Sequence, residues 1–170
     1  MYECKITPSM IESAKKKSDS MGVIKGSVRG GGGNMIGFLG EELVKKHFGI
    51  GDANTYEYDL MYEGKKLEVK TKERNVIPNM SYNATVFSWN TTQQCDYYIF
   101  CSIFKNFKRG WICGFIKPVD FKNNAKFSKK GDPDGDYFKF FTDCYNLPYL
   151  QLNNMLKFPK ESRCHLDGLI

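Results

Sequence analysis

The sequence predicts an α/β (α+β) fold in which a mixed central β-sheet is flanked by helices. Residues 35–48 repeat apolar side chains at helical spacing. Residues 58–72 alternate polar and apolar side chains around a short turn that contains glycine, a pattern typical of a β-hairpin. The runs 84–89, 96–104 and 109–116 are rich in β-branched and aromatic residues, which favours three further strands.

Composition limits the class of protein. A length of 170 residues suits one domain, and 41% hydrophobic with 15% aromatic residues is typical of a globular protein rather than a disordered one. No apolar run approaches the roughly 18 residues that span a bilayer, and the N-terminus has no secretory pattern, so we expect a cytoplasmic protein without a membrane partner. Six cysteines without a Cys-x-x-Cys pair indicate buried free thiols rather than a zinc site.

The N-terminal part of the chain predicts a short helix and a long loop. Thr7 and Pro8 suit an N-cap and a first helical position. Residues 16–34 then change to Ser, Gly and basic residues, which predicts a flexible loop. Arg29 and the backbone amides of this loop are candidates for phosphate contacts, although a simple connector explains the composition equally well. The lysine and hydroxyl residues of a P-loop are missing.

A second helix follows this loop. Asn34 is the expected N-cap and Gly49 the expected stop signal. The apolar positions that recur at helical spacing are Ile36, Leu39, Leu43, Val44 and Phe48. Near the C-terminus, residues 129–136 predict turns, and Pro148 suits the start of a closing helix over residues 147–158.

The hairpin at 58–72 carries an unusual arrangement of charge. A two-residue turn at Glu63-Gly64 pairs Tyr62 with Lys65 and Leu60 with Leu67, and the same register continues with Asp59 opposite Glu68, Tyr58 opposite Val69 and Glu57 opposite Lys70. Directly opposed like charges destabilise a sheet. A one-residue slip would separate them but would turn the apolar side chains of the other face outward.

Two interpretations account for the facing acids. A divalent cation shared by Asp59 and Glu68 would remove the repulsion, since carboxylate oxygens suit Mg²⁺, and Lys70 lies on the same face beside them. Alternatively the hairpin presents a solvated charged face, on which Lys70 and Lys72 offset the acids by cross-strand pairing.

The pattern Asp59, then Glu68-Val69-Lys70, on a hairpin resembles the PD-(D/E)XK nuclease superfamily, which has the restriction-endonuclease-like fold. Members commonly begin with a helix that carries Gly-Glu, and Gly40-Glu41 resembles that feature. The resemblance covers residues 36–72. It departs from the family name in one respect, because no proline precedes Asp59.

The resemblance implies a metal-dependent nuclease. Asp59, Glu68 and the backbone carbonyl of Val69 would hold Mg²⁺, or Mn²⁺ in its place, and Glu41 would add a carboxylate. Lys70 would orient or help deprotonate the attacking water and stabilise the transition state. On a helical wheel Glu41 and Glu42 both flank the apolar stripe, so the choice of Glu41 rests on the resemblance alone.

The resemblance also favours DNA as the substrate and an endonuclease of the restriction or homing type. The net charge of +6 suits a phosphate backbone, with Lys72, Arg74 and Arg29 as candidate contacts. A homodimer would supply the two sites that double-strand cleavage needs. The alternatives are an exonuclease or Holliday-junction resolvase on the same fold, or a non-catalytic DNA-binding or interaction protein. The Lys-, Asn- and Phe-rich composition would suit a phage or mobile element, and then the host cytoplasm.

Overall fold

The computed structural model describes residues 1–21, 34–53, 57–88, 94–134 and 138–159, and their fold is mixed α+β. In chain order the elements are β1 (Tyr2–Lys5), α1 (Pro8–Met21), α2 (Asn34–Phe48), β2 (Leu60–Tyr62), β3 (Lys65–Arg74), β4 (Asn83–Phe87), β5 (Tyr97–Phe104), β6 (Arg109–Ile116), α3 (Pro118–Asn124), β7 (Lys126–Ser128) and β8 (Cys144–Pro148). Two 3-10 turns follow, at Tyr149–Gln151 and Met155–Lys157.

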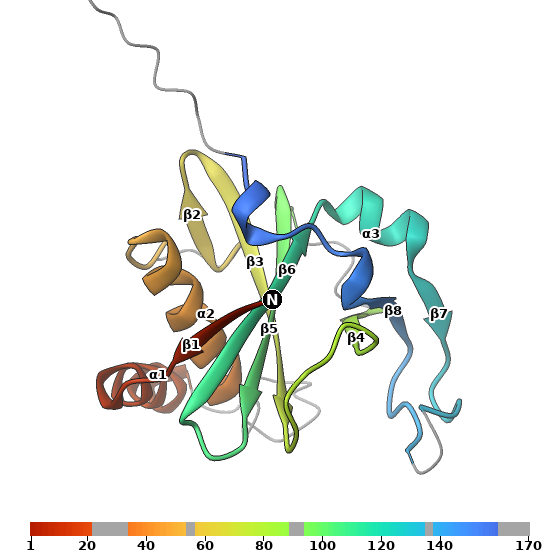
Figure 1. Cartoon of the computed structure of the whole chain (residues 1–170), viewed down its shortest axis with the longest axis horizontal. Coiled ribbons are helices and arrows are strands. Elements are labelled where there is room, and N and C mark those ends of the chain that lie inside the picture. The colour runs from red at the N-terminus through yellow and green to blue at the C-terminus, as the bar shows by residue number, and fades with distance from the viewer. Residues whose placement is uncertain (22–33, 54–56, 89–93, 135–137, 160–170) are drawn as a thin grey trace, which may run out of the picture.

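The strands of the described residues form two sheets (Figure 1). The main sheet has the order β1-β6-β5-β3-β2, and the second sheet has the order β4-β8-β7. Within the main sheet β3 and β5 are parallel, whereas the other neighbours are antiparallel. A parallel pair needs a crossover connection, which is often a helix. Here the chain between β3 and β5 contains β4, so the crossover contributes the first strand of the second sheet.

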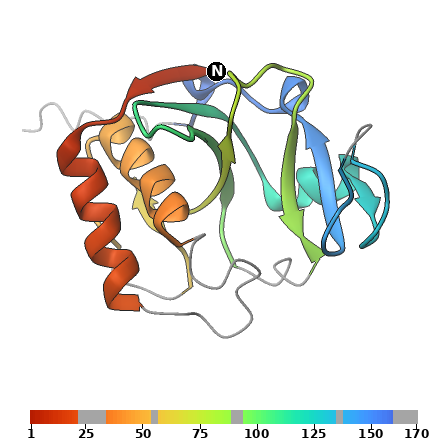
Figure 2. The same ribbon diagram turned by 90° about the horizontal axis from the view of Figure 1, so that it is seen from below.

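Helices and the second sheet cover opposite faces of the main sheet. Figure 2 shows α1 and α2 on one side, with β4, β8, β7 and α3 on the other. Each side has its own apolar cluster. Leu39, Leu43, Leu67, Val69 and Ile99 belong to the cluster under the helices, which is the larger of the two. The cluster on the other side joins side chains of both sheets, among them Val86, Phe100, Trp111, Leu147 and Tyr149.

Alternation along β3 separates its apolar and polar side chains. Leu67 and Val69 pack under the helices. The even-numbered side chains from Glu68 to Arg74 point to the face that the second sheet covers, beside Tyr98 and Phe100 of β5. The predicted site residues of this strand therefore share this face, and Lys72 contacts the second sheet through Thr85 of β4.

The predicted hairpin turn and its first pairs are confirmed. Tyr62 pairs with Lys65 and Leu60 with Leu67. Glu63 and Gly64 both have positive φ, 46° and 70°, as a tight two-residue hairpin turn requires. The expected ladder beyond Leu60 is wrong, because β2 begins there and the residues before it lie outside the strand.

The first helix is longer than the sequence predicted. It continues to Met21, so the predicted loop does not begin at residue 16. Met10 and Ala14 are buried against α2, and this packing stabilises the helix in spite of its polar C-terminal half. Asn34 is the first residue of α2 rather than a cap before it. Residues 22–33, with the predicted phosphate contact Arg29, lie outside the described residues.

The predicted closing helix is wrong. Pro148 ends β8 instead of beginning a helix, and the chain continues through the two 3-10 turns. Tyr149, Met155 and Phe158 are buried while Leu150 and Leu156 are exposed, so the segment lies along the sheets and does not form one amphipathic face. The sequence also gave no prediction of β1, α3 and β7.

Candidate functional site

Asp59 is fixed to β3 by two hydrogen bonds. Its backbone N–H donates to the carbonyl of Leu67 at 3.1 Å, and its carboxylate Oδ2 accepts from the backbone N–H of Val69 at 2.7 Å. The Asp59 side chain therefore takes the Val69 N–H, which the predicted pairing with Tyr58 would have used. This explains why the ladder stops at Leu60. Glu57 forms an ion pair with Lys66, with 3.7 Å between Oε2 and Nζ.

Glu68 and Lys70 form an ion pair on the same face of β3. The Lys70 ammonium donates to Glu68 Oε1 at 2.7 Å, and the two side chains are 16% and 5% exposed, respectively. Because the pair is two residues apart on one strand, its geometry follows from the pleat. The structure thus brings together the two central residues of the predicted motif.

Asp59 lies between two other carboxylates, those of Glu41 and Glu68, in its electrostatic interactions. Burial, together with the negative charge of Glu68, raises the pKa of Asp59 to about 7. Burial, together with the negative charge of Asp59, raises the pKa of Glu41 to about 8. The hydrogen bond from Val69 and the charges of Lys70 and Lys17 oppose the shift of Asp59 without cancelling it. In the carboxylate cluster, formed by Glu41, Asp59 and Glu68, burial and carboxylate repulsion therefore outweigh the nearby positive charges at Asp59 and Glu41.

The structure distinguishes the two adjacent glutamates of α2. Glu42 accepts hydrogen bonds from Ser13 Oγ at 2.8 Å and from Lys45, so its carboxylate fastens α1 to α2. Glu41 instead interacts electrostatically with Asp59. The helical wheel alone did not separate these environments, because they depend on the position of α1 and β2 around α2.

Gly40 lets α2 approach β3 closely enough to bring Glu41 to the cluster. A Cβ built on Gly40 would lie 1.9 Å from Thr71 Oγ1, far inside any contact distance. The Thr71 hydroxyl is buried against this glycine and has no hydrogen-bond partner within the described residues. Close packing at this point leaves no space for another side chain.

Two neighbours of the cluster were not predicted as site residues. Lys17 of α1 lies 3.7 Å from Glu41 Oε2 and also binds Asp52. The local composition predicts a loop at this position, although Lys17 follows Met10 and Ala14 at helical spacing and lies in α1. Cys95 is the second neighbour: burial raises its pKa to about 12, and the charge of Glu68 contributes. Nothing in its sequence context pointed to the site.

The oxygens of the carboxylate cluster are of the kind that a hard divalent cation such as Mg²⁺ prefers. Among the described residues, however, no three His, Cys, Asp or Glu side chains are already grouped as metal ligands. Glu68 is directed to Lys70, and Asp59 to the Val69 N–H. Glu41, Asp59 and Glu68 are thus neighbours, but their side chains would have to reorient to bind one metal ion.

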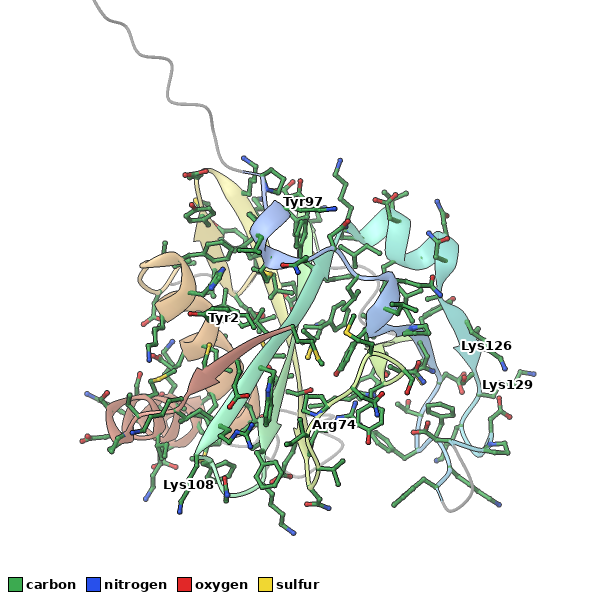
Figure 3. All side chains as sticks on the ribbon, in the orientation of Figure 1. Tyr2, Arg74, Tyr97, Lys108, Lys126 and Lys129 are labelled. Carbon is green, nitrogen blue, oxygen red and sulfur yellow. The ribbon has the colours of Figure 1, made fainter. Side chains whose placement is uncertain are left out.

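Lys72 and Arg74, the predicted phosphate contacts of β3, are half-buried and contact neutral side chains of other segments. Lys72 Nζ donates to Thr85 Oγ1 of β4 at 2.6 Å. Arg74 stacks on Tyr82, with 4.8 Å from Cζ to the ring centroid, and its Nη2 donates to Tyr149 Oη at 3.5 Å. Figure 3 shows Arg74 between the two sheets and Lys108 at the periphery, at the β5–β6 turn.

Comparisons with known proteins do not assign the chain. No protein-family model matches it, and neither does any curated protein that was searched. Among the residues that the structure describes, no helix has the length and apolar character to cross a membrane.

Proposed function

We propose that this chain is a Mg²⁺-dependent deoxyribonuclease of the PD-(D/E)XK type, with a restriction-endonuclease-like core, and that it acts as an endonuclease on DNA. The observation that carries the proposal is the carboxylate cluster with Lys70 bound to Glu68 at its edge. Raised pKa values of several groups in one place are typical of functional sites. The choice of DNA rests on the motif that resembles the nuclease superfamily.

Asp59, Glu68, the carbonyl of Val69 and Glu41 would hold Mg²⁺ or Mn²⁺. When bound, the metal supplies a Lewis acid for the phosphate and lowers the pKa of a coordinated water. The chain itself supplies the positioning. The Val69 N–H holds Asp59, and Lys17 offsets part of the charge on Glu41. A buried setting strengthens each of these interactions because it contains little water.

Lys70 has the role of a cation at the reacting phosphate. Its ammonium has three donors and lies beside the carboxylates. With substrate bound, this ammonium would contact a non-bridging phosphate oxygen and orient the attacking water. In the hydrolysis the water oxygen forms a new P–O bond, the P–O ester bond to the leaving group breaks, and the leaving oxygen takes a proton that derives from the water.

A second function has support from the same contacts. The bonds from Lys70 to Glu68 and from Val69 to Asp59 are also what a purely structural charge cluster would form. That alternative is a non-catalytic DNA-binding or interaction protein. An exonuclease or a junction resolvase would share the metal residues, and would differ from an endonuclease in the DNA that it cleaves.

Cleavage assays separate these functions. Supercoiled plasmid, linear duplex, single strands and branched DNA are incubated with the protein in Mg²⁺, Mn²⁺ or chelator. We expect nicking or linearisation of plasmid that depends on the metal. Lys70→Ala should lower the cleavage rate about 10²-fold or more, since deletion of one transition-state contact has this effect. DNA binding in Ca²⁺ should fall far less.

Lys108→Ala is the matched control, because Lys108 is an exposed lysine at the β5–β6 turn, away from the cluster. It should cleave as the wild type does. Absence of cleavage by the wild type on all four substrates in both metals would overturn the proposal in favour of a non-catalytic role. A wild-type cleavage rate in Lys70→Ala would overturn the assignment of this hairpin as the active site.

A further inference from the structure

Beyond the carboxylate cluster, β3 carries two more cations on the face that the second sheet covers. Lys72 and Arg74 are two positions apart, so their Cα atoms are separated by about 6.6 Å, and Lys70 precedes them at the same interval. The three side chains form one row along the strand. The row leads from the carboxylate cluster along the face of the main sheet that the second sheet covers, where Lys72 contacts β4.

The hydrogen-bond partners of Lys72 and Arg74 are neutral. The Lys72 ammonium donates to the hydroxyl of Thr85, and the Arg74 guanidinium donates to the hydroxyl of Tyr149. Arg74 Nε is buried and has no hydrogen-bond partner within the described residues. Within that part of the chain, neither cation is within ion-pair distance of a carboxylate.

The surroundings leave this positive charge poorly compensated. Burial, together with the positive charge of Arg74, lowers the pKa of Lys72 to about 8, although the charge of Asp134 partly opposes the shift. Tyr149 stays protonated, because burial raises its pKa to about 12. The Lys72 and Arg74 side chains are both half-buried. Removing a cation from water without a counter-charge costs free energy, so a protein retains such groups where an anion binds or where they have a structural task.

We propose that the half-exposed cations Lys72 and Arg74 form an anion site where the two sheets meet, and that its ligand is a backbone phosphate of a nucleic-acid strand that passes Lys70. The guanidinium and ammonium groups suit phosphate oxygens by charge and by donor geometry. The source of the phosphate rests on the proposed function, whereas the anion site rests on the geometry alone. Because the cations form a row, this phosphate would be a neighbour of the scissile phosphate along the nucleic-acid strand.

A structural task is the competing explanation. Lys72 belongs to a network in which Thr85 Oγ1 donates to Asn146 Oδ1 at 2.6 Å, and Asn146 Nδ2 donates to Ser128 Oγ at 3.2 Å. In that case the lysine would tie the second sheet to the main sheet. The explanations predict opposite effects of its removal on the ligand-free protein. Loss of a structural bond destabilises the fold, whereas loss of a repelled cation leaves it as stable or more stable.

The test uses the metal-free protein in chelator, so that it does not depend on catalysis. Melting temperature and binding are measured with inorganic phosphate, with a short oligothymidylate without terminal phosphates, and with the same oligomer in uncharged methylphosphonate form. We expect the charged oligomer to bind and stabilise the wild type, and the uncharged oligomer to do neither. Lys72→Met and Arg74→Gln should each weaken binding about tenfold or more. Each should also make the slope of log K against log[salt] shallower by about 0.7, which is the contribution of one phosphate contact on a single strand.

Two further variants complete the design. Arg74→Lys keeps the charge but not the planar guanidinium, so its affinity for the oligomer should lie between those of the wild type and Arg74→Gln. This variant also keeps the test valid if Arg74→Gln fails to fold. Lys108→Met removes an exposed charge and should leave affinity within about twofold. Destabilisation of the ligand-free protein by Lys72→Met, with unchanged oligomer affinity in both site variants, would overturn the anion site. Binding of inorganic phosphate without binding of the oligomer would overturn a nucleic-acid strand as the source.

Because no metal is present, these outcomes are independent of the cleavage assay. A protein that binds the oligomer through Lys72 and Arg74 but never cleaves DNA would contradict the nuclease proposal and keep the anion site. Cleavage of DNA by the wild type, together with unchanged oligomer affinity in Lys72→Met and Arg74→Gln, would support the nuclease proposal and contradict the anion site.

Discussion

Asp59 combines two effects that usually oppose each other. Its carboxylate accepts a hydrogen bond from the Val69 N–H at 2.7 Å, which stabilises the fold, while burial and Glu68 make its negative charge unfavourable. The first effect needs only an oxygen acceptor, whereas the second depends on charge. Two substitutions at this one position therefore separate them.

Asp59→Asn should leave the metal-free protein as stable as the wild type or more stable at pH 8, because the amide oxygen still accepts from Val69 and the repulsion is gone. Asp59→Ala removes the acceptor too and should be about 1 kcal/mol less stable than Asp59→Asn. Chemical denaturation in chelator measures both. Neither variant should cleave DNA in Mg²⁺. Marked destabilisation by Asp59→Asn would indicate a structural salt bridge instead of a metal site.

The pH dependence of stability follows from the same residues. The folded pKa values, about 7 for Asp59 and about 8 for Glu41, lie above the ordinary carboxyl value of about 4. Between these limits the folded protein holds protons that the unfolded chain has released. The free energy of unfolding should therefore fall as pH rises from about 4 to 8, by up to about 1.4 kcal/mol per pH unit for each titrating group.

Denaturation of the metal-free protein across this range tests the slope. The double variant Asp59→Asn, Glu41→Gln should lose most of this decrease in stability with pH, because the two amide side chains do not titrate. A wild-type stability that rises over the same range would show that the two carboxylates are better compensated than their surroundings indicate.

At the scale of elements, the contact between α2 and β3 decides whether Glu41 reaches the cluster. Gly40→Ala would place a methyl group 1.9 Å from Thr71 Oγ1. We expect it to destabilise the fold by about 1–3 kcal/mol through overpacking and to lower cleavage, because Glu41 is the next residue of the helix. Thermal or chemical unfolding and the plasmid assay measure the two effects.

Gly37 provides the matched control on the same helix. A Cβ at Gly37 would meet nothing within 4 Å, so Gly37→Ala should be neutral or stabilise the helix by up to about 1 kcal/mol. Equal effects of the two substitutions would contradict the close approach at Gly40.

The elements also show what the sequence was able to predict. The hairpin register was predictable because turn chemistry at Glu63-Gly64 and the apolar positions Leu60 and Leu67 agree on one pairing. The hydrogen bond from Val69 to Asp59 was not predictable, because a side chain that takes a backbone donor leaves no periodic pattern. The closing helix failed since Pro148 suits a helix start and a strand end alike, and tertiary packing decided between them.

At the scale of the whole molecule, the environment of Lys72 and Arg74 was outside the reach of local patterns. On the strand alone they alternate with Thr71 and Glu73 and would point to solvent. They are enclosed because β4 and β8, from residues 83–87 and 144–148, form a second sheet over that face. Contacts between segments so far apart in the sequence follow from the topology, which a single sequence specifies only through the complete fold.

The carboxylate cluster joins α2, β3 and the residue before β2 at one point, so a metal bound there should stabilise the whole fold. A ligand that binds only the folded state at about 100 times its Kd adds about 2.7 kcal/mol. For a chain of this size, that corresponds to a rise of about 5–10 °C in Tm. We expect such a rise for the wild type in Mn²⁺ at pH 8, where the acids are largely ionised, and almost none for Asp59→Asn.

The two adjacent glutamates give this prediction its sharpest form. Glu41→Gln should reduce the Mn²⁺ shift, because Glu41 interacts with Asp59. Glu42→Gln should lower the starting Tm, since Glu42 binds Ser13 and Lys45, but it should keep the shift. A shift that survives in Glu41→Gln and disappears in Glu42→Gln would exchange their roles. A wild-type Tm that does not change in Mn²⁺ would contradict metal binding by the cluster, and the raised pKa values would then describe a purely structural group of buried acids.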